Sequence, residues 1–270
     1  METSTKTEAI IQVRNLVVAY EERVILDNIN LVIPRGETTV ILGGSGCGKS
    51  TLLRHLIGLH KPESGNILVK GRDITQLGEQ ELSDILRKVG VVFQSSALFN
   101  SISVGDNVAL PLREHTRLEE STIQIMTKIK LDMVGLSGYE RFMPSELSGG
   151  MKKRAAFARA ISMDPEILFC DEPSAGLDPI VAAGLDQLIL KLKKALKMTI
   201  VVVTHEMASM YLIADHIIML NGGKVIFTGT QEEFKKSQND RVRQFIERRP
   251  EEYSEEEIGR YARALTTDSF

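Results

Sequence analysis

Four nearly continuous apolar runs divide the middle of the chain: TVIL at 39–42, VGVVF at 89–93, EILFC at 166–170 and TIVVV at 199–203. Apolar and polar residues do not alternate within them, which is typical of parallel strands that are buried on both faces. The pattern therefore predicts an α/β fold whose core is a parallel sheet containing these four strands.

A different pattern precedes these runs. From Ile10 to about Ile33 the chain reads IIQVRNLVVAY and then VILDNINLVI, with a polar break at 21–23. Such β-rich segments favour antiparallel pairing, so we expect an N-terminal antiparallel β-subdomain. Near the other end, HIIMLNGGKVIFTGT predicts a hairpin that turns across 221–223, with strands near 217–220 and 224–227.

The stretch between the second and third apolar runs has a mostly helical pattern, which includes GDNVALPLREH and LEESTIQIMTKIKLDMVGL. We interpret about 96–163 as a helical subdomain inserted into the α/β core. The end of the chain carries two charged helical patterns, NDRVRQFIERR and SEEEIGRYARAL. We therefore expect a main domain over 1–237 and a C-terminal helical extension over 238–270.

Composition narrows the class of protein. With 270 residues, 43% of them apolar, the chain can bury one large core or two closely packed subdomains. The formal charge of -3 provides no overall field for nucleic acid, so we expect no nucleic-acid partner. No secretory leader and no membrane-spanning stretch is recognisable, which predicts a soluble, cytoplasmic protein. Cys47 and Cys170 have no metal or redox spacing, so we expect reduced thiols without a chemical role.

The segment ILGGSGCGKST at 41–51 fits the phosphate-loop pattern GxxxxGK[ST]. Its glycines can adopt positive φ and turn backbone N–H groups around phosphates, Lys49 adds a charge for the β- and γ-oxygens, and Ser50 offers a hydroxyl to Mg²⁺. A plain glycine-rich turn is the alternative, but the apolar strand before the loop favours phosphate binding. The candidate nucleotide-binding residues are Gly43, Gly44, Ser45, Gly46, Cys47, Gly48, Lys49, Ser50 and Thr51.

Three strand ends carry polar side chains that suit phosphoryl transfer. Asp171 and Glu172 follow ILFC, where Asp171 fits a magnesium role and Glu172 fits the residue that polarises the attacking water. Gln94, after VVF, could reach both the metal and the water. His205, after VVVT, could donate to the γ-phosphate. Taken alone, an acidic pair at a strand end is often only solvated, and a single histidine at a strand end is more often structural. The presence of the phosphate loop favours the interpretation that these residues together form a catalytic site.

A second glycine-rich corner, LSGGM, begins a helical run at Ser148, Gly149 and Gly150. Its hydroxyl and backbone N–H groups would form another anion site, which one triphosphate does not need. We infer that this corner closes over nucleotide held by another subunit, although a simple helix cap explains it equally well. Asp178, in SAGLD, lies in a turn after the catalytic strand, where a structural turn is an equally good interpretation.

In this order the motifs resemble the nucleotide-binding subunit of ABC transporters, over about Ile11 to Thr230. The resemblance implies a P-loop NTPase (RecA-like) core that hydrolyses ATP with Mg²⁺, with Ser50, Gln94 and Asp171 at the metal. It also implies a head-to-tail dimer that sandwiches two ATP molecules and drives membrane permease subunits through a groove near Gln94. Tyr20 would stack on adenine, although an aromatic residue at a strand end is commonly a packing residue.

Met151 departs from the broad family, which usually has Gln there, and a thioether cannot make the hydrogen bonds of an amide. The stretches ALFNSISVGDNVALPLREHT, ELSGGMKKRAAFARAI and NDRVRQFI are similar to the ATPases of Mla-type systems. That likeness implies phospholipid transport with an MCE-class protein, maintenance of outer-membrane lipid asymmetry, and a peripheral location on the inner face of the cytoplasmic membrane. The tail beyond 238 would contact the neighbouring ATPase or a small regulatory subunit, or form a solvated charged helix.

Three other classes compete with this interpretation. One is the ATPase of another ABC importer or exporter. Another is a soluble ABC ATPase that acts on nucleic acid or ribosomes, but such chains usually carry a coiled-coil arm or two tandem motif sets, and neither occurs here. The third is a P-loop kinase, in which the LSGG corner would have no chemical role.

Overall fold

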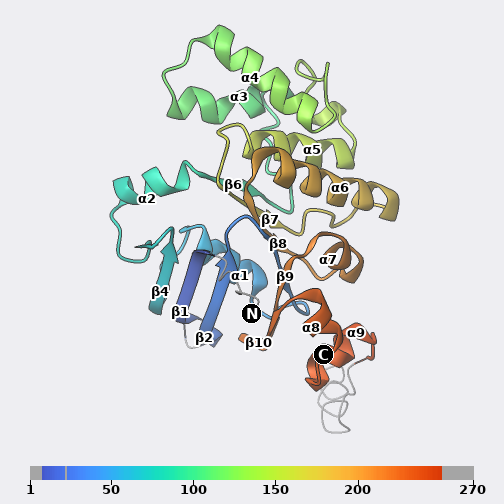
Figure 1. Cartoon of the computed structure of the whole chain (residues 1–270). Helices are drawn as coiled ribbons and strands as arrows, with labels where there is room; N and C mark the ends of the chain where they lie inside the picture. The colour runs from blue at the N-terminus through green and yellow to red at the C-terminus, as the bar shows by residue number, and fades with distance from the viewer. Residues whose placement is uncertain (1–7, 22, 251–270) are drawn as a thin grey trace, which may run out of the picture. The chain divides into compact units, whose positions relative to one another are not determined.

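The computed structural model describes residues 8–21 and 23–250, and the chain divides into two compact units at Lys236/Ser237. The larger unit contains two sheets and the helices that cover them (Figure 1). In the smaller unit, α9 (Asp240–Ile246) is capped by Asn239, whose side chain accepts from two backbone N–H groups. The second helix expected in the tail, near 254–265, lies outside the described residues. No described helix combines the length and the apolar character that a membrane span requires.

A six-stranded sheet forms the centre of the larger unit, in the order β10-β9-β3-β8-β7-β6. Its strands are β3 (Thr38–Leu42), β6 (Val89–Val92), β7 (Ile167–Asp171), β8 (Thr199–Val203), β9 (His216–Asn221) and β10 (Lys224–Gly229). All neighbours are parallel except β9 and β10, which form the expected hairpin. The four apolar runs are thus confirmed as parallel strands. The sequence did not predict that β9 would join β3, because a hairpin pattern does not specify which sheet it extends.

The second sheet is antiparallel throughout, in the order β2-β1-β4-β5. It consists of β1 (Ala9–Tyr20), β2 (Arg23–Pro34), β4 (Ser64–Val69) and β5 (Arg72–Asp73). The N-terminal antiparallel subdomain is therefore confirmed. Strands β4 and β5 were not predicted, because SGNILVKGRD has only a short apolar run between polar residues and glycines.

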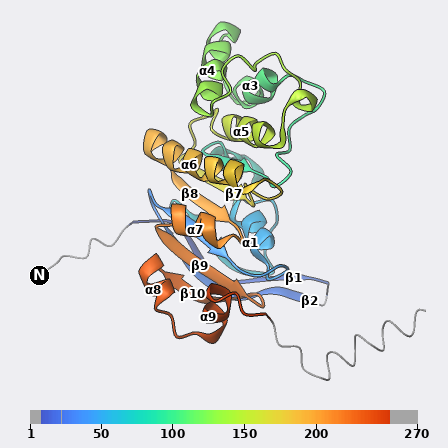
Figure 2. The same cartoon turned by 90° about the vertical axis from the view of Figure 1, so that its right-hand side faces the viewer.

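Helix α1 (Lys49–Leu56) lies between the two sheets, and a single apolar core includes both sheets and this helix. The fully buried members include Leu16 and Ile33 of the antiparallel sheet, Leu52 and Leu56 of α1, and Phe169 and Val201 of the parallel sheet. Helices α6 (Pro179–Leu196) and α7 (Met207–Ile213) cover the other face of the parallel sheet (Figure 2). The core thereby fixes the phosphate loop, which connects β3 to α1.

The predicted helical range 96–163 contains α3 (Val104–His115), α4 (Glu120–Met133), the short 3-10 turn Pro144–Glu146 and α5 (Gly149–Ala160). Ala109, Leu112 and Ile123 form a small apolar core of their own there. Asn107 is fully buried and its side chain exchanges hydrogen bonds with the backbone of Phe99, so it holds the irregular segment before α3. The remaining helices of this unit are α2 (Glu79–Leu86), which precedes β6, and α8 (Gln231–Lys235).

Candidate functional site

The phosphate loop lies between β3 and α1, and its backbone needs glycine. Gly46 and Gly48 have φ of 73° and 101°, in the left-handed region that other residues avoid. A Cβ on Gly43 would lie 2.5 Å from the backbone oxygen of Leu220, and one on Gly48 would lie 2.6 Å from the side chain of Leu26. The sequence pattern therefore has a steric cause, because larger residues would disrupt the loop.

Lys49 is 8% exposed and its ammonium group donates to the backbone oxygens of Gly43 and Gly44, both at 2.9 Å. No ion pair to Lys49 is recorded within the described residues. A buried cation that contacts only neutral acceptors keeps an uncompensated charge. The loop is thus electrostatically suited to a bound anion. Ser45 and Gly46 are exposed at the tip of the loop, whereas Cys47 is buried beneath it, where burial raises the pKa of its thiol.

Ser50 and Asp171 meet where β7 ends. The Ser50 hydroxyl donates to a carboxylate oxygen of Asp171 at 3.1 Å. Burial raises the pKa of Asp171, and the hydrogen bond from Ser50 opposes that shift. Hydroxyl and carboxylate oxygens suit Mg²⁺. No group of three or more His, Cys, Asp or Glu side chains suitable for a metal occurs in the described part of the chain. The donor set therefore fits a magnesium ion that takes its other ligands from phosphate oxygens and water.

Glu172 and His205 form the second contact at these strand ends. His205 Nδ1 lies 2.9 Å from Glu172 Oε1, and the imidazole is 59% exposed whereas the carboxylate is 11% exposed. Glu172 Oε2 is buried and has no hydrogen-bond partner. An unpaired buried carboxylate oxygen is costly and indicates a site for a water molecule or ligand. Glu172 also has a φ of 45°, in the left-handed region that strained functional residues often occupy.

Gln94 follows β6, which pairs with β7, so its backbone lies at the same edge of the sheet. Its side chain is exposed, and its backbone oxygen accepts a hydrogen bond from Lys153 at 2.6 Å. Lys153 was not predicted as a site residue, because the run KKR is typical of the solvated face of a helix. Lys153 is 6% exposed, and burial lowers the pKa of its ammonium group, although the charges of Asp171 and Glu172 act in the opposite direction.

The LSGG corner lies at the start of α5, with α3 and α4, and away from the phosphate loop and α1 of the same chain (Figures 1 and 2). Ser148 caps α5 by accepting from the backbone N–H of Met151 at 3.3 Å. A Cβ on Gly150 would lie 2.6 Å from Val181, so glycine allows the corner to contact α6 closely. The structure thus supports a capping role for Ser148, and it does not bring the corner to the nucleotide loop.

Asp178 and Tyr20 complete the predicted set. Asp178 caps α6, because its carboxylate accepts from the backbone N–H groups of Ile180 and Val181, both at 3.0 Å. Tyr20 ends β1 and is 47% exposed. It is therefore not a core packing residue, and its ring is accessible. Ile180, next to the cap, is 85% exposed and adds an apolar side chain to this surface.

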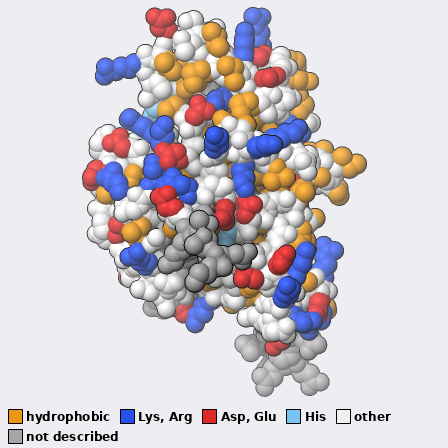
Figure 3. Space-filling view, in the orientation of Figure 1, with side chains coloured by type: hydrophobic (Ala, Val, Ile, Leu, Met, Phe, Trp, Pro, Cys, Tyr) orange, Lys and Arg blue, Asp and Glu red, His pale blue; other side chains and the backbone are white. Residues whose placement is uncertain are grey.

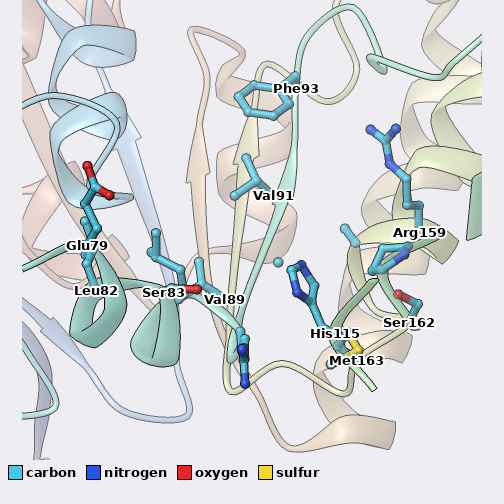
Figure 4. A pocket seen from close by; sticks show the side chains of 15 residues that line it. Glu79, Leu82, Ser83, Val89, Val91, Phe93, His115, Arg159, Ser162 and Met163 are labelled. Atoms are coloured by element: carbon cyan, nitrogen blue, oxygen red, sulfur yellow. The ribbon is translucent and has the colours of Figure 1, made fainter. Parts of the chain in front are cut away.

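A groove of about 530 Å³ lies beside β6 (Figure 4). Its residues come from α2, β6, the end of α3 and the end of α5, and include Leu82, Val89, Val91, Phe93, His115, Arg159, Ser162 and Met163. The groove is mostly apolar, but Ser162 Oγ is buried without a partner. The Arg159 guanidinium donates to the backbone oxygens of Ser96 and Ala97, and burial lowers its pKa. The groove and the Gln94 segment are therefore structurally connected.

Comparison with known proteins identifies the family. Residues 26–175 match the family described as ABC transporter. The intermembrane phospholipid transport system ATP-binding protein MlaF of Haemophilus influenzae is 46% identical over 237 residues, which is 88% of this chain and 90% of that protein. The probable ribonucleotide transport ATP-binding protein mkl of Mycobacterium leprae is 44% identical, over 87% of this chain and 68% of that protein.

A solved structure, the dimeric post-hydrolysis state of an ATP-binding cassette bound to ADP and Pi, superimposes with a TM-score of 0.76 at 32% identity. It covers 82% of this chain and 98% of the cassette. The P-loop NTPase core predicted from the motifs is thereby confirmed. The chain belongs to the ABC transporter family, as one of its ATPase subunits.

Proposed function

We propose that this ATPase drives a membrane permease that transports phospholipids, and that it hydrolyses ATP between two copies of itself. The observation that carries the hydrolytic assignment is Glu172, which has one oxygen held by His205 and the other buried without a partner. Glu172 follows directly on Asp171, which contacts Ser50 of the phosphate loop. A carboxylate in that position suits the orientation of a water molecule toward the terminal phosphate.

Each residue of the site has a distinct task in this proposal. The loop over 43–51 binds the phosphates through backbone N–H groups, and Lys49 turns from the carbonyls of Gly43 and Gly44 to the phosphate oxygens. Ser50, Asp171 and Gln94 would hold Mg²⁺. When bound, Mg²⁺ neutralises negative charge on the phosphates during transfer. The exposed ring of Tyr20 stacks on adenine.

Glu172 accepts a hydrogen bond from the attacking water through Oε2. His205 fixes the carboxylate through Oε1 and presents its exposed ring edge to the γ-phosphate. Phosphoryl transfer depends chiefly on positioning and on charge stabilisation, so a small rotation of this carboxylate would slow the reaction strongly.

The second copy supplies Ser148, Gly149, Gly150 and the loop at Asp178. Two observations support a dimer with shared sites. The LSGG corner lies away from the phosphate loop of its own chain (Figures 1 and 2), and the similar solved cassette with ADP and Pi is dimeric. The exposed Ile180 beside Asp178 supplies an apolar contact for that interface.

The groove beside β6 receives an amphipathic segment of the permease. Val89, Val91 and Phe93 form an apolar floor, while Arg159 adds a positive charge (Figure 4). Large apolar side chains are also exposed around α3 and α4, and apolar atoms gather at that end of the molecule in Figure 3. They are Phe99, Leu118, Ile125, Ile129 and Phe142.

The substrate assignment rests on the relatives. The named phospholipid relative is matched over 90% of its length, whereas the relative named for ribonucleotide transport is matched over 68%. Phospholipid transport is therefore the preferred assignment, with maintenance of outer-membrane lipid asymmetry as its purpose. In this assembly the ATPase lies on the inner face of the cytoplasmic membrane. An MCE-domain protein and a small regulatory subunit complete it, and the extension over 238–270 contacts the regulatory subunit or the neighbouring ATPase.

The test is to purify the intact complex from its native membrane in detergent and to identify its subunits and bound lipid by mass spectrometry. We expect two copies of this chain, a permease, an MCE-domain protein and phospholipid. A soluble-solute receptor without an MCE-domain protein would reject the lipid assignment but keep the transporter. Co-purification with nucleic acid or ribosomes, without a permease, would reject transport altogether.

A further inference from the structure

Lys153 of α5 is a buried cation that has no acidic partner. It is 6% exposed, and among the described residues no carboxylate lies within ion-pair distance of its ammonium group. Its recorded acceptors are two backbone oxygens, of Gln94 at 2.6 Å and of Glu172 at 3.4 Å. Burial of a cation against neutral acceptors is costly, and an apolar side chain of similar size usually stabilises such a position better. Stability therefore does not explain why a lysine occupies this place.

The two acceptors belong to the segments that the proposed reaction uses. Gln94 follows β6 and Glu172 follows β7, so the ammonium group connects the ends of two neighbouring strands. Both segments contain non-glycine residues in the left-handed region, with φ of 64° at Ser96, 49° at Ala97 and 45° at Glu172. Such backbone conformations persist only where the surroundings hold them.

The remainder of α5 also holds the Gln94 segment. Arg159, six residues after Lys153, donates to the backbone oxygens of Ser96 and Ala97 at 3.2 and 2.7 Å. A Cβ on Gly90 of β6 would lie 2.4 Å from the backbone oxygen of Ala160, so the end of α5 contacts β6 directly. Helix α5 thus fixes 94–97 at both ends. Lys153 is buried and also reaches Glu172, whereas Arg159 is half-buried and contacts only the Gln94 segment.

We propose that Lys153 is a positioning residue for ATP hydrolysis. Its ammonium group sets the backbone of Gln94 and Glu172, so that the amide and the carboxylate face the same water molecule. The inference rests on the proposed roles of Gln94 and Glu172. Because Lys153 contacts only backbone oxygens and lies outside the phosphate loop, its removal changes the rate of hydrolysis and leaves nucleotide affinity nearly intact. Arginine at this position keeps a cation with several donors and restores part of the rate.

The experiment compares Lys153→Met, Lys153→Arg and Glu172→Gln in the full-length protein purified with its membrane partners. Lys130→Met is the matched control, because Lys130 is also a buried lysine, 5% exposed, but pairs with Asp164 away from the nucleotide site. For each variant, kcat and KM for ATP are measured, and the Kd for ATP is obtained by fluorescence titration. The Tm of each variant is measured alongside, so that a loss of kcat can be distinguished from a loss of stability.

For Lys153→Met we expect kcat to fall about tenfold or more, because misplacement of reacting groups by about 1 Å can cost about 10²-fold. The Kd should stay within about twofold, Lys153→Arg should recover part of kcat, and Lys130→Met should keep the normal kcat. If Lys153→Met hydrolyses at the normal rate while Glu172→Gln does not, the positioning role is rejected and the proposed function stands. An active Glu172→Gln would reject the proposed role of Glu172 and this inference with it. Equal losses in Lys153→Met and Lys130→Met would reduce Lys153 to a structural residue.

Discussion

His205 Nδ1 lies 2.9 Å from Oε1 of Glu172, while Oε2 of the same carboxylate is buried and unpaired. The two oxygens of the Glu172 side chain therefore have different environments: Oε1 contacts His205, and Oε2 is available for a water molecule. A base that orients water needs both conditions, because a carboxylate that rotates freely would not keep its second oxygen in place.

Replacement of Glu172 by Gln should leave ATP binding intact and lower the rate of hydrolysis by roughly 10² to 10⁴-fold, the typical contribution of a positioned general base. The amide nearly keeps the shape of the side chain but cannot accept a proton from water. Phosphate release measured at saturating ATP, together with an ATP titration, checks this. The closed dimer should accumulate with ATP, which gel filtration detects. Hydrolysis near the normal rate would contradict the assignment.

His205→Ala should lower the rate of hydrolysis while the Kd for ATP changes little. Because His205 contacts Glu172 directly, the two substitutions should not be additive. In the double variant, loss of His205 should lower the rate by a smaller factor than in the unmodified protein, since the carboxylate that it orients is absent and only its contact to the γ-phosphate is lost. The kcat values of the four proteins form a double-mutant cycle. A fully additive result would show that His205 acts independently of Glu172.

Lys49→Ala should weaken ATP binding by about 10- to 100-fold, because a charge-assisted hydrogen bond contributes about 1.5–3 kcal/mol. The folded protein should survive, since the ammonium group contacts only Gly43 and Gly44 in the same loop. A titration with ATP measures the effect, and Lys194→Ala, on the exposed face of α6, is the control. Unchanged affinity in Lys49→Ala would contradict the phosphate-loop assignment.

Gly43→Ala and Gly44→Ala form a matched pair within the loop. A Cβ on Gly43 would meet the backbone oxygen of Leu220 at 2.5 Å, whereas nothing lies within 4 Å of one on Gly44. We expect Gly43→Ala to lower stability by about 1–3 kcal/mol and to abolish tight ATP binding, because the backbone must shift. Gly44→Ala should keep most of its stability and most of its affinity for ATP. Urea unfolding and ATP titration distinguish the two, and equal effects would show that the close approach to Leu220 is unimportant.

Acid should destabilise the fold through His55, which is 1% exposed in α1 and whose Nδ1 lies 2.8 Å from the backbone oxygen of Thr51. Burial lowers the pKa of His55 below its usual 6.5. The unfolded chain therefore takes up a proton first. The stabilising contribution is complete above pH 6.5 and is lost as the pH falls toward the folded pKa, by up to about 1.4 kcal/mol per pH unit.

The measurement is the free energy of unfolding in urea at pH 7.5, 6.5 and 5.5. His55→Gln should flatten the pH dependence of the free energy of unfolding between pH 6.5 and 5.5. Some slope should remain, because burial also lowers the pKa of His216. His115→Gln, which removes an exposed histidine, should keep the original slope. If His55→Gln and His115→Gln showed the same slope, buried His55 would not be its source.

The parallel strands and the phosphate loop were predictable because local patterns determine them. A fully buried strand needs a continuous apolar run, and the loop needs glycines at fixed spacing. Lys153 was not predictable in this way. Its acceptors, Gln94 and Glu172, lie 59 and 19 residues away in the chain, so no local pattern shows that this lysine is buried. For the same reason the sequence did not predict the pairing of β9 with β3 or the left-handed backbone of Glu172.

The contact between Gly43 and Leu220 also constrains how the molecule is made. During synthesis the glycine loop leaves the ribosome long before β9, which must align with β3 to place the Leu220 oxygen against it. Contacts so distant in sequence form late in folding. A nascent chain that ends before Leu220 thus contains every residue of the phosphate loop but not the strand that braces it. We therefore expect tight nucleotide binding only in chains that extend past Leu220.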